Sequence, residues 1–212
     1  MAETIKMEKD WSSVVDVLLL ETDKLSKLGK ITDAVERLLV LEKQTRTSAD
    51  LSSNSRVLLH IITLAYDAKD WKLLNESIVV LSKKRALLKQ AITNMVQHAI
   101  KYVDEISDMK IKLELIDTLR TVTDGKIFVE VERARLTRSL AKMKEAENKV
   151  EEAAELMQDL QVETYGSMDK REKTDFILEQ MRLCLAKKDY TRAHVMSRKI
   201  SPKFLWKLPI TI

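Results

Sequence analysis

The residues best suited to chemistry in this sequence are three histidines and one cysteine. His60, His98 and His194 stand alone, because no second histidine, cysteine or carboxylate follows at a metal-ligand spacing such as i, i+4 on the same helix. Cys184 falls on the apolar side of its predicted helix, where a buried, unreactive thiol is expected rather than a nucleophile. A glycine-rich phosphate-binding loop is also missing from the sequence. We therefore predict no metal, no cofactor, no small-molecule substrate and no enzyme activity.

Two clusters of basic residues are the remaining candidates for a binding site. Their ordinary interpretation is a solvated helix face or compensation of helix C-termini. As binding surfaces they would suit an acidic protein partner or nucleic acid, but they lack the interleaved aromatic side chains on which single strands stack. An acidic protein is therefore favoured over nucleic acid. The candidate partner-facing residues are Lys83, Lys84 and Arg85 in the first cluster and Arg133, Arg135 and Arg138 in the second.

The composition favours long helices. The chain of 212 residues has 3 glycines and 2 prolines, both prolines lie beyond residue 200, and 45% of the residues are hydrophobic. Its 37 basic and 33 acidic residues are interspersed and leave a formal charge of +4, unlike the concentrated positive field of a dedicated nucleic-acid-binding protein.

Neither a signal peptide nor a membrane span is predicted. The first ten residues are polar, and the apolar run from Val14 to Leu20 is short and broken by Asp16. A single cysteine excludes an intrachain disulfide and suits a reducing compartment. The sequence thus predicts a soluble intracellular protein.

A repeat of about 40 residues organises the helices. Apolar residues stand three and ten positions after the start of four of the five repeats, and the third repeat departs with Glu114 and Thr121. Such a period is typical of antiparallel helix pairs, which must stack to bury their apolar faces. We predict an all-α, right-handed α-solenoid of about five TPR-like antiparallel helix pairs. The repeats start at Ile31, Trp71, Ile111, Val150 and Tyr190, which are 40, 40, 39 and 40 residues apart.

Local signals place the helices and their ends. A serine-rich piece from Leu51 to Arg56 is expected to delay the second pair. Ser167 is expected to be the N-cap of the first helix of the last pair, with Asp169 as an anion in its first turn. Gly166 is expected to act as a hinge that Gly166→Val would disturb. The first helices are predicted at 11–28, 50–67, 86–106, 127–147 and 168–186, and the second helices at 31–46, 70–84, 110–123, 149–163 and 190–200.

Apolar spacing predicts the buried face of two of these helices. In the first helix the face comprises Val14, Val15, Leu18, Leu19, Thr22 and Leu25. In the helix at 168–186 it comprises Phe176, Ile177, Met181, Cys184 and Leu185.

The predicted domain boundary lies at residue 200. Residues 1–200 are expected to form one helical-repeat domain, and residues 201–212 an irregular apolar tail, because two prolines end helical order there. A solenoid normally ends in a polar cap. The tail is therefore interpreted as a docking strand or as the end of a chain that should continue.

Two blocks of the sequence resemble a known family. They are IKLELIDTLRTVTDGKIFVEVERARLTRSLAKMK at 111–144 and LQVETYGSMDKREKTDFILEQMRLCLAKKDY at 160–190. Both closely resemble PCI-family non-ATPase scaffold subunits of the 26S proteasome regulatory particle lid, and the likeness extends more thinly back to the first helices. The resemblance implies a TPR-like solenoid followed by a winged-helix PCI module, which this chain lacks, so a truncated or partial form is expected.

The resemblance also implies a function. It points to a non-catalytic scaffold of the cytoplasm and nucleus that supports lid assembly and ubiquitin-dependent degradation. Its partners would be other lid subunits and, by family analogy, the ATPase ring or core particle, and no catalytic residue carries over. Two alternatives stay open. One is a PCI-type scaffold of the signalosome or the translation initiation complex, and the other is a nucleic-acid-binding helical repeat that uses Arg133, Arg135 and Arg138.

Overall fold

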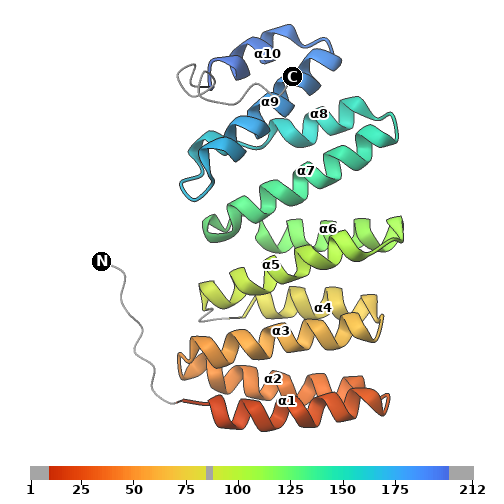
Figure 1. Ribbon diagram of the computed structural model, residues 1–212, viewed down its shortest axis with the longest axis vertical. Helices are drawn as coiled ribbons and strands as arrows, with labels where there is room; N and C mark the ends of the chain where they lie inside the picture. Colours follow the sequence, from red (N-terminus) through yellow and green to blue (C-terminus); the bar gives the residue numbers. More distant parts are fainter. Residues whose placement is uncertain (1–9, 85–87, 201–212) are drawn as a thin grey trace. The chain divides into compact units, whose positions relative to one another are not determined.

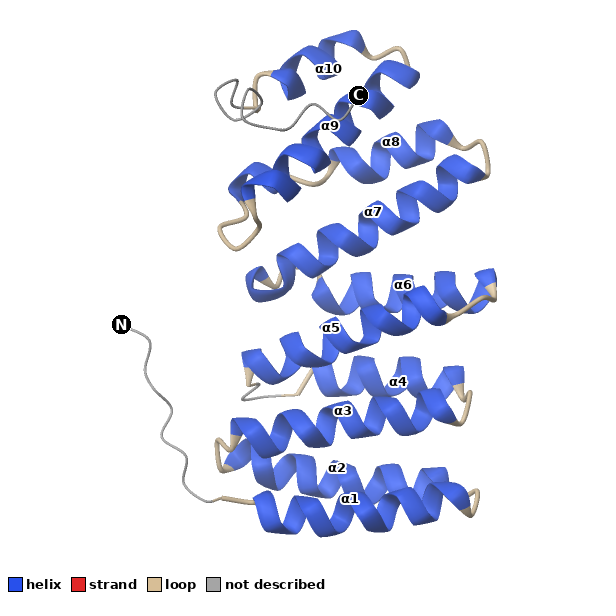
Figure 2. Cartoon of the chain, viewed as in Figure 1, coloured by secondary structure: helices blue, strands red, loops and turns tan. Residues whose placement is uncertain are grey.

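The protein is helical throughout the part of the chain that the structure describes. The computed structural model describes residues 10–84 and 88–200, and within these ranges it has ten α-helices, two 3₁₀ helices and no strand (Figure 2). The predicted all-α fold class is confirmed. The predicted tail at 201–212 lies outside the described residues. The α-helices are α1 (Ser12–Lys27), α2 (Ile31–Thr47), α3 (Leu51–Asp67), α4 (Trp71–Ser82), α5 (Lys89–Glu105), α6 (Met109–Thr123), α7 (Glu130–Ala146), α8 (Val150–Gln158), α9 (Lys170–Ala186) and α10 (Tyr190–Ser197), and the 3₁₀ helices are η1 (Ile127–Val129) and η2 (Val162–Thr164).

The chain forms two compact units, Met1–Val129 and Glu130–Ile212. In the first unit, α1–α2, α3–α4 and α5–α6 form three antiparallel helix pairs (Figure 1). In the second unit, α7–α8 and α9–α10 form two more. These are the five pairs that the repeat predicts. That residues 1–200 make up a single domain stays a prediction.

In four of the five helix pairs, the turn between the two helices contains a residue in the left-handed backbone conformation. In the first pair, the Gly29 amide donates to Ser26 O at 2.9 Å and the Lys30 amide donates to Leu25 O at 3.0 Å. This is the Schellman motif, which satisfies the last carbonyls of a helix and requires a positive φ. The four left-handed residues are Gly29, Lys69, Asn148 and Lys188, with φ angles of 77°, 56°, 63° and 63°.

Glycine is expected to stabilise two of these turns. Lys69→Gly and Lys188→Gly should each raise the free energy of unfolding by up to about 1 kcal/mol, because the left-handed conformation strains a residue that has a Cβ. Urea unfolding followed by circular dichroism measures the change. Gly29→Ala is the opposite control and should lower the free energy of unfolding by about 1 kcal/mol. A loss of stability in both lysine variants would contradict this account of the turns.

The structure shows no steric requirement for glycine at the expected hinge, Gly166. Its φ lies outside the left-handed region, and a Cβ at this position would meet nothing within 4 Å. The turn that precedes α9 therefore does not require glycine, and Gly166→Val should change the free energy of unfolding by less than about 0.5 kcal/mol.

The repeat positions lie in the core as predicted. Ala34, Leu74 and Ala153, three residues after their repeat starts, are at most 1% exposed. The departure of the third repeat is also confirmed, since Glu114 and Thr121 are both exposed. The third pair compensates with a different stripe on α6, where Leu115, Ile116 and Leu119 are buried.

The serine-rich piece does not delay the second pair. Helix α3 begins at Leu51, and its N-cap Asp50 accepts a hydrogen bond from the Ser53 amide at 3.0 Å. The Asn54 side chain donates to the Glu42 carbonyl at 3.2 Å and to Thr45 Oγ1 at 3.0 Å. Asn54 fits in the helix because its side chain is buried and its amide makes these two hydrogen bonds to α2, whereas the buried Ser53 hydroxyl has no partner.

Other helix ends differ from the predicted ones. Helix α8 ends at Gln158 rather than near 163, and η2 follows it. The N-cap of α9 is Asp169, whose carboxylate accepts from the Arg171 amide at 2.7 Å, so Ser167 is not the cap. Helix α5 begins at Lys89, and η1 precedes α7.

Of the residues predicted on the two apolar faces, two are exposed and four, Leu18, Leu19, Leu25 and Met181, are only partly buried. On α9, Phe176, Ile177 and Cys184 are buried, but Leu185 is 51% exposed and Leu183 is buried instead. On α1, Val14 is 45% exposed. Both outliers lie at the edge of the predicted stripe, where the sequence pattern does not specify which neighbouring helix is present.

Candidate interaction surface

The residues that could do chemistry are separated in the structure. No group of three or more histidine, cysteine, aspartate or glutamate side chains is arranged to hold a metal within 10–84 and 88–200. Cys184 is a free thiol, 1% exposed, and Gln158 Nε2 lies 3.9 Å from its sulfur. An unreactive core thiol is the interpretation that this burial supports.

His60 lies between α1 and α3. Its Nε2 is 3.1 Å from Thr22 Oγ1 and 3.3 Å from an Asp23 carboxylate oxygen. Burial lowers the pKa of His60 from its usual value of 6.5, and the charges of Asp23 and Asp67 oppose this only in part. The imidazole is therefore an uncharged structural group at neutral pH.

This burial predicts a loss of stability in mild acid. Because the pKa of His60 is lower in the folded state than in the unfolded state, the unfolded chain binds the proton more readily as pH falls below 6.5. The free energy of unfolding should fall between pH 7 and pH 5, and His60→Gln should flatten this dependence. The exposed His194 supplies the control, since His194→Gln should leave the slope unchanged. Equal slopes in the parent protein and His60→Gln would contradict the assignment.

Polar side chains one repeat apart join the first helices of neighbouring pairs. Between α1 and α3, Arg56 pairs with Asp16, and the Trp11 amide donates to Asp50 at 2.9 Å. The predicted register could have located these contacts, because their sequence separations of 40 and 39 equal the repeat length.

The contact between α3 and α5 uses the same separation. Tyr66 stacks on Tyr102 with ring centroids 3.8 Å apart, and its hydroxyl donates to Glu105 at 2.8 Å. Burial and this hydrogen bond raise the pKa of Tyr66 to about 12. Thr63 Oγ1 lies 3.0 Å from the Tyr102 hydroxyl. This stacked and hydrogen-bonded set positions one pair against the next.

The second basic cluster lies at the junction between α7 and α9. Arg135 makes two hydrogen bonds to Glu172, at 2.7 and 2.9 Å, and these hold the pKa of Glu172 below its usual value. Arg138 pairs with Glu179 and lies 4.9 Å from the centre of the Phe176 ring. Arg135 and Arg138 therefore bind carboxylates of the same chain. That these arginines and Arg133 also face a partner stays a prediction.

The residues of the first basic cluster also differ in whether they pair within the chain. Lys84 Nζ lies 2.8 Å from the carboxylate of Glu42, which is 2% exposed and also pairs with Arg46 at 2.8 Å. Lys83 is exposed, and Arg85 lies outside the described residues. The burial of Glu42 could not be predicted from the sequence, since its position in a charged helix resembles a solvated one.

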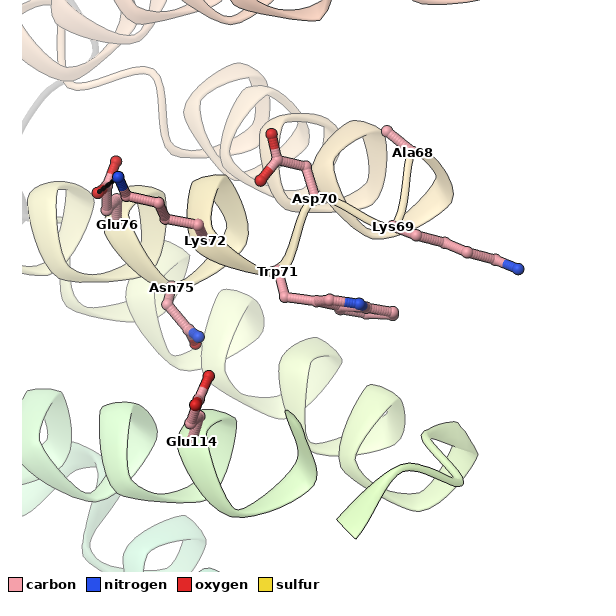
Figure 3. A pocket seen from close by; sticks show the side chains of 8 residues that line it. All are labelled: Ala68, Lys69, Asp70, Trp71, Lys72, Asn75, Glu76 and Glu114. Carbon is pink, nitrogen blue, oxygen red and sulfur yellow. Dashed lines mark ion pairs between the residues drawn. The ribbon is translucent and has the colours of Figure 1, made fainter. Parts of the chain in front are cut away.

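A shallow groove of about 650 Å³ lies between α4 and α6 (Figure 3). Asn75 of α4 points toward Glu114 of α6, and the Trp71 ring lies along the wall. Glu114 is the residue at which the third repeat departs from the apolar pattern, so this departure places a carboxylate in the groove. Its side chains offer hydrogen bonds but no nucleophile with a base beside it.

Helices of the described chain are too short or too polar to cross a lipid bilayer.

Comparisons with known proteins show that the chain is similar to proteasome subunits. The family model described as PSMD12/CSN4, N-terminal, matches residues 33–208. The 26S proteasome non-ATPase regulatory subunit 12 of Dictyostelium discoideum is 52% identical over 200 residues, which are 94% of this chain and 45% of that protein.

Two further relatives agree. Homolog A of the same subunit in Arabidopsis thaliana is 52% identical over 82% of this chain and 40% of its own length. The 26S proteasome regulatory subunit RPN5 of Saccharomyces cerevisiae is 44% identical over 94% of this chain and 45% of its own length. The chain thus spans less than half the length of the curated relatives it matches.

Proposed function

Because the chain belongs to the PSMD12/CSN4 N-terminal family, we propose that it is a non-catalytic scaffold of the 26S proteasome regulatory particle lid. It supports lid assembly and ubiquitin-dependent degradation through protein contacts, and it works in the cytoplasm and nucleus. The observation that carries the proposal is the identity of 44% to 52% with proteasome regulatory subunits over most of the chain.

The construction of the surface supports a scaffold. Many of its charged side chains are committed to joining one helix pair to the next, as in Arg135 with Glu172 and Lys84 with Glu42. Stacked pairs of this kind present extended faces to partners. Other lid subunits are the proposed partners, with the ATPase ring or the core particle as further contacts. Lys83 and Arg133 stay candidate partner-facing residues of such a face.

Co-purification tests this function. The chain, tagged and expressed in eukaryotic cells at a low level, should retain other proteasome lid subunits, which mass spectrometry identifies. Failure to retain any lid subunit, while circular dichroism reports the expected helix content, would contradict the proposal. Retention of signalosome or initiation-complex subunits instead would favour the alternative PCI-type scaffolds.

A nucleic-acid-binding repeat is the alternative from another class. It requires affinity for RNA or DNA that falls steeply as salt rises. Flat titrations with RNA and duplex DNA at low salt would exclude it. The pairing of Arg135 and Arg138 with carboxylates of their own unit weakens this alternative, because the same side chains would have to contact phosphates.

A further inference from the structure

Two polar residues interrupt the apolar pattern of the repeat and face each other across the groove between α4 and α6. Glu114 of α6 stands three residues after its repeat start, and Asn75 of α4 stands four residues after its own. Asn75 points toward Glu114 (Figure 3). In the other repeats the aligned residues are apolar and buried, except for the exposed His194. They are Ala34, Leu74, Ala153 and Ala193 at the first position and Val35, Leu115 and Ala154 at the second.

Contacts within the chain do not explain these two residues. Glu114 is exposed and makes no hydrogen bond or ion pair with the residues at 10–84 and 88–200. The Asn75 Oδ1 atom is buried and has no hydrogen-bond partner in the same ranges. Polar residues that break a local rule without stabilising the fold are expected at functional sites, and a buried acceptor without a donor favours a ligand that supplies one.

Trp71 provides an aromatic wall beside these acceptors. Its ring lines the same groove and makes an edge-to-face contact with Tyr66, with ring centroids 5.8 Å apart. Tyr66 is itself stacked on Tyr102. Trp71 is only partly buried, so part of its ring stays accessible while these contacts hold it in place. Among side chains, the indole ring attracts cations most strongly.

The uncompensated charge in the groove is negative. Lys72 and Glu76 lie 3.9 Å apart and offset each other, and the Lys69 side chain points away from Glu114 (Figure 3). The Glu114 carboxylate therefore attracts a cation. A metal ion does not fit, because the described residues contain no group of three histidine, cysteine, aspartate or glutamate side chains that could hold one.

The groove lies inside the repeat rather than at one end of it. Helices α4 and α6 belong to the second and third pairs of the first unit, and they contact each other. A further helix pair in a stack packs beside the last pair. It would therefore not come between α4 and α6.

We propose that the groove between α4 and α6 binds an arginine side chain of a partner protein. The planar guanidinium lies against the Trp71 ring and donates hydrogen bonds to the Glu114 carboxylate. Rotation of the Asn75 side-chain amide, a soft torsion, turns its Oδ1 toward the same group. Arginine fits this set better than lysine, because its five donors lie in one plane and it stacks on aromatic rings. The inference rests on the proposed scaffold function and names the chemistry of one partner contact.

An arginine peptide tests the groove directly. The probe is a blocked pentapeptide with one central arginine between glycines and serines, titrated at millimolar concentration into the isotope-labelled full chain. The indole N–H resonance of Trp71, assigned by its loss in Trp71→Phe, should shift and saturate. The same peptide with citrulline, which keeps the shape but lacks the charge, should bind at least about tenfold more weakly. A lysine peptide should bind several-fold more weakly.

Two variants remove the acceptors one at a time. Glu114→Gln should weaken binding of the arginine peptide at least about tenfold, because charge-assisted hydrogen bonds are lost. Asn75→Leu should weaken it several-fold. Glu76→Gln is the matched control, since it changes a carboxylate of the same groove that already pairs with Lys72, and it should change the affinity less than about twofold. Circular dichroism checks that each variant retains the helix content of the parent chain.

Several outcomes would overturn the proposal. They are a Trp71 resonance that does not shift, equal binding of the arginine and citrulline peptides, and equal effects of Glu114→Gln and Glu76→Gln. Binding that appears only after deletion of residues 201–212 would make that segment the occupant. A dimer, detected by light scattering and dissolved by Glu114→Gln, would make a second copy of the chain the occupant.

The peptide assay and the co-purification assay fail separately. Loss of peptide binding while lid subunits still co-purify would overturn the arginine site alone. Specific binding of the arginine peptide without co-purification of lid subunits would overturn the proposed lid function alone.

Discussion

Phe176→Ala is expected to lower the free energy of unfolding of the second unit by about 3–5 kcal/mol. The ring is completely buried in a core that includes Ala134, Met157 and Leu183. Alanine would leave a cavity that the surrounding helices can close only in part, and it would also remove the ring beneath the Arg138 guanidinium. Urea unfolding followed by circular dichroism, with hydrogen exchange of the α9 amides, measures the loss.

Position and size provide the controls for this prediction. Leu185→Ala, on the same helix but 51% exposed, should cost less than about 0.5 kcal/mol. Phe176→Leu keeps most of the volume and should cost about 1–2 kcal/mol. Comparable losses in Phe176→Ala and Leu185→Ala would mean that the assigned inner and outer faces of α9 are wrong.

The helix pairs were predictable because their signal is repeated. Period and apolar spacing identify five pairs from positions such as Ala34, Leu74 and Ala153, all at most 1% exposed. Each repeat is an independent example of the same constraint, so an irregular one such as the third, with Glu114, does not obscure the register. The few prolines and glycines exclude most competing folds.

Helix ends were less predictable because they depend on single contacts across the fold. Nothing in the residues 51–56 says that Asn54 will bond Glu42 O and Thr45, yet these contacts allow the serine-rich piece to be helical from Leu51. The end of α8 is set by Gln180, a residue 22 positions beyond Gln158. Local propensity is a weak guide where a distant side chain supplies the cap.

The basic cluster could be predicted from the sequence, but its ion pairs within the chain could not. The arginines at 133, 135 and 138 were recognised as a cluster, whereas their pairing with Glu172 and Glu179 depends on how α7 lies against α9. Leu185 of α9 is predicted as core and is exposed for a related reason. The spacing identifies a face suited to helix contact, but it does not say whether another helix of the chain covers that face.

Gln180→Leu is expected to lower the free energy of unfolding by about 2–3 kcal/mol, because a buried cap of α8 would be lost. Gln180 is 1% exposed, and its Nε2 donates to Met157 O at 2.7 Å and to Leu160 O at 2.8 Å. Leucine fills similar space but leaves these two carbonyls without that donor. The Gln180 Oε1 atom has no partner, so its removal returns part of the cost, which keeps the expected loss below the sum for two carbonyls. Urea unfolding at neutral pH measures it.

Gln180→Glu separates this cap from a simple packing role. At neutral pH a carboxylate would face the two carbonyl oxygens in a buried site, so the variant should be less stable than Gln180→Leu. Burial would raise the pKa of the new carboxyl above the value of about 4.3 in the unfolded chain, and its stability relative to Gln180→Leu should therefore fall as pH rises through that folded-state pKa. The comparison at pH 5 and pH 7.5 uses Gln180→Leu as the reference, which removes the contribution of His60. A constant difference between the two variants across this range, or a Gln180→Glu protein as stable as the parent, would show that the side chain at 180 does not cap α8 from a buried site.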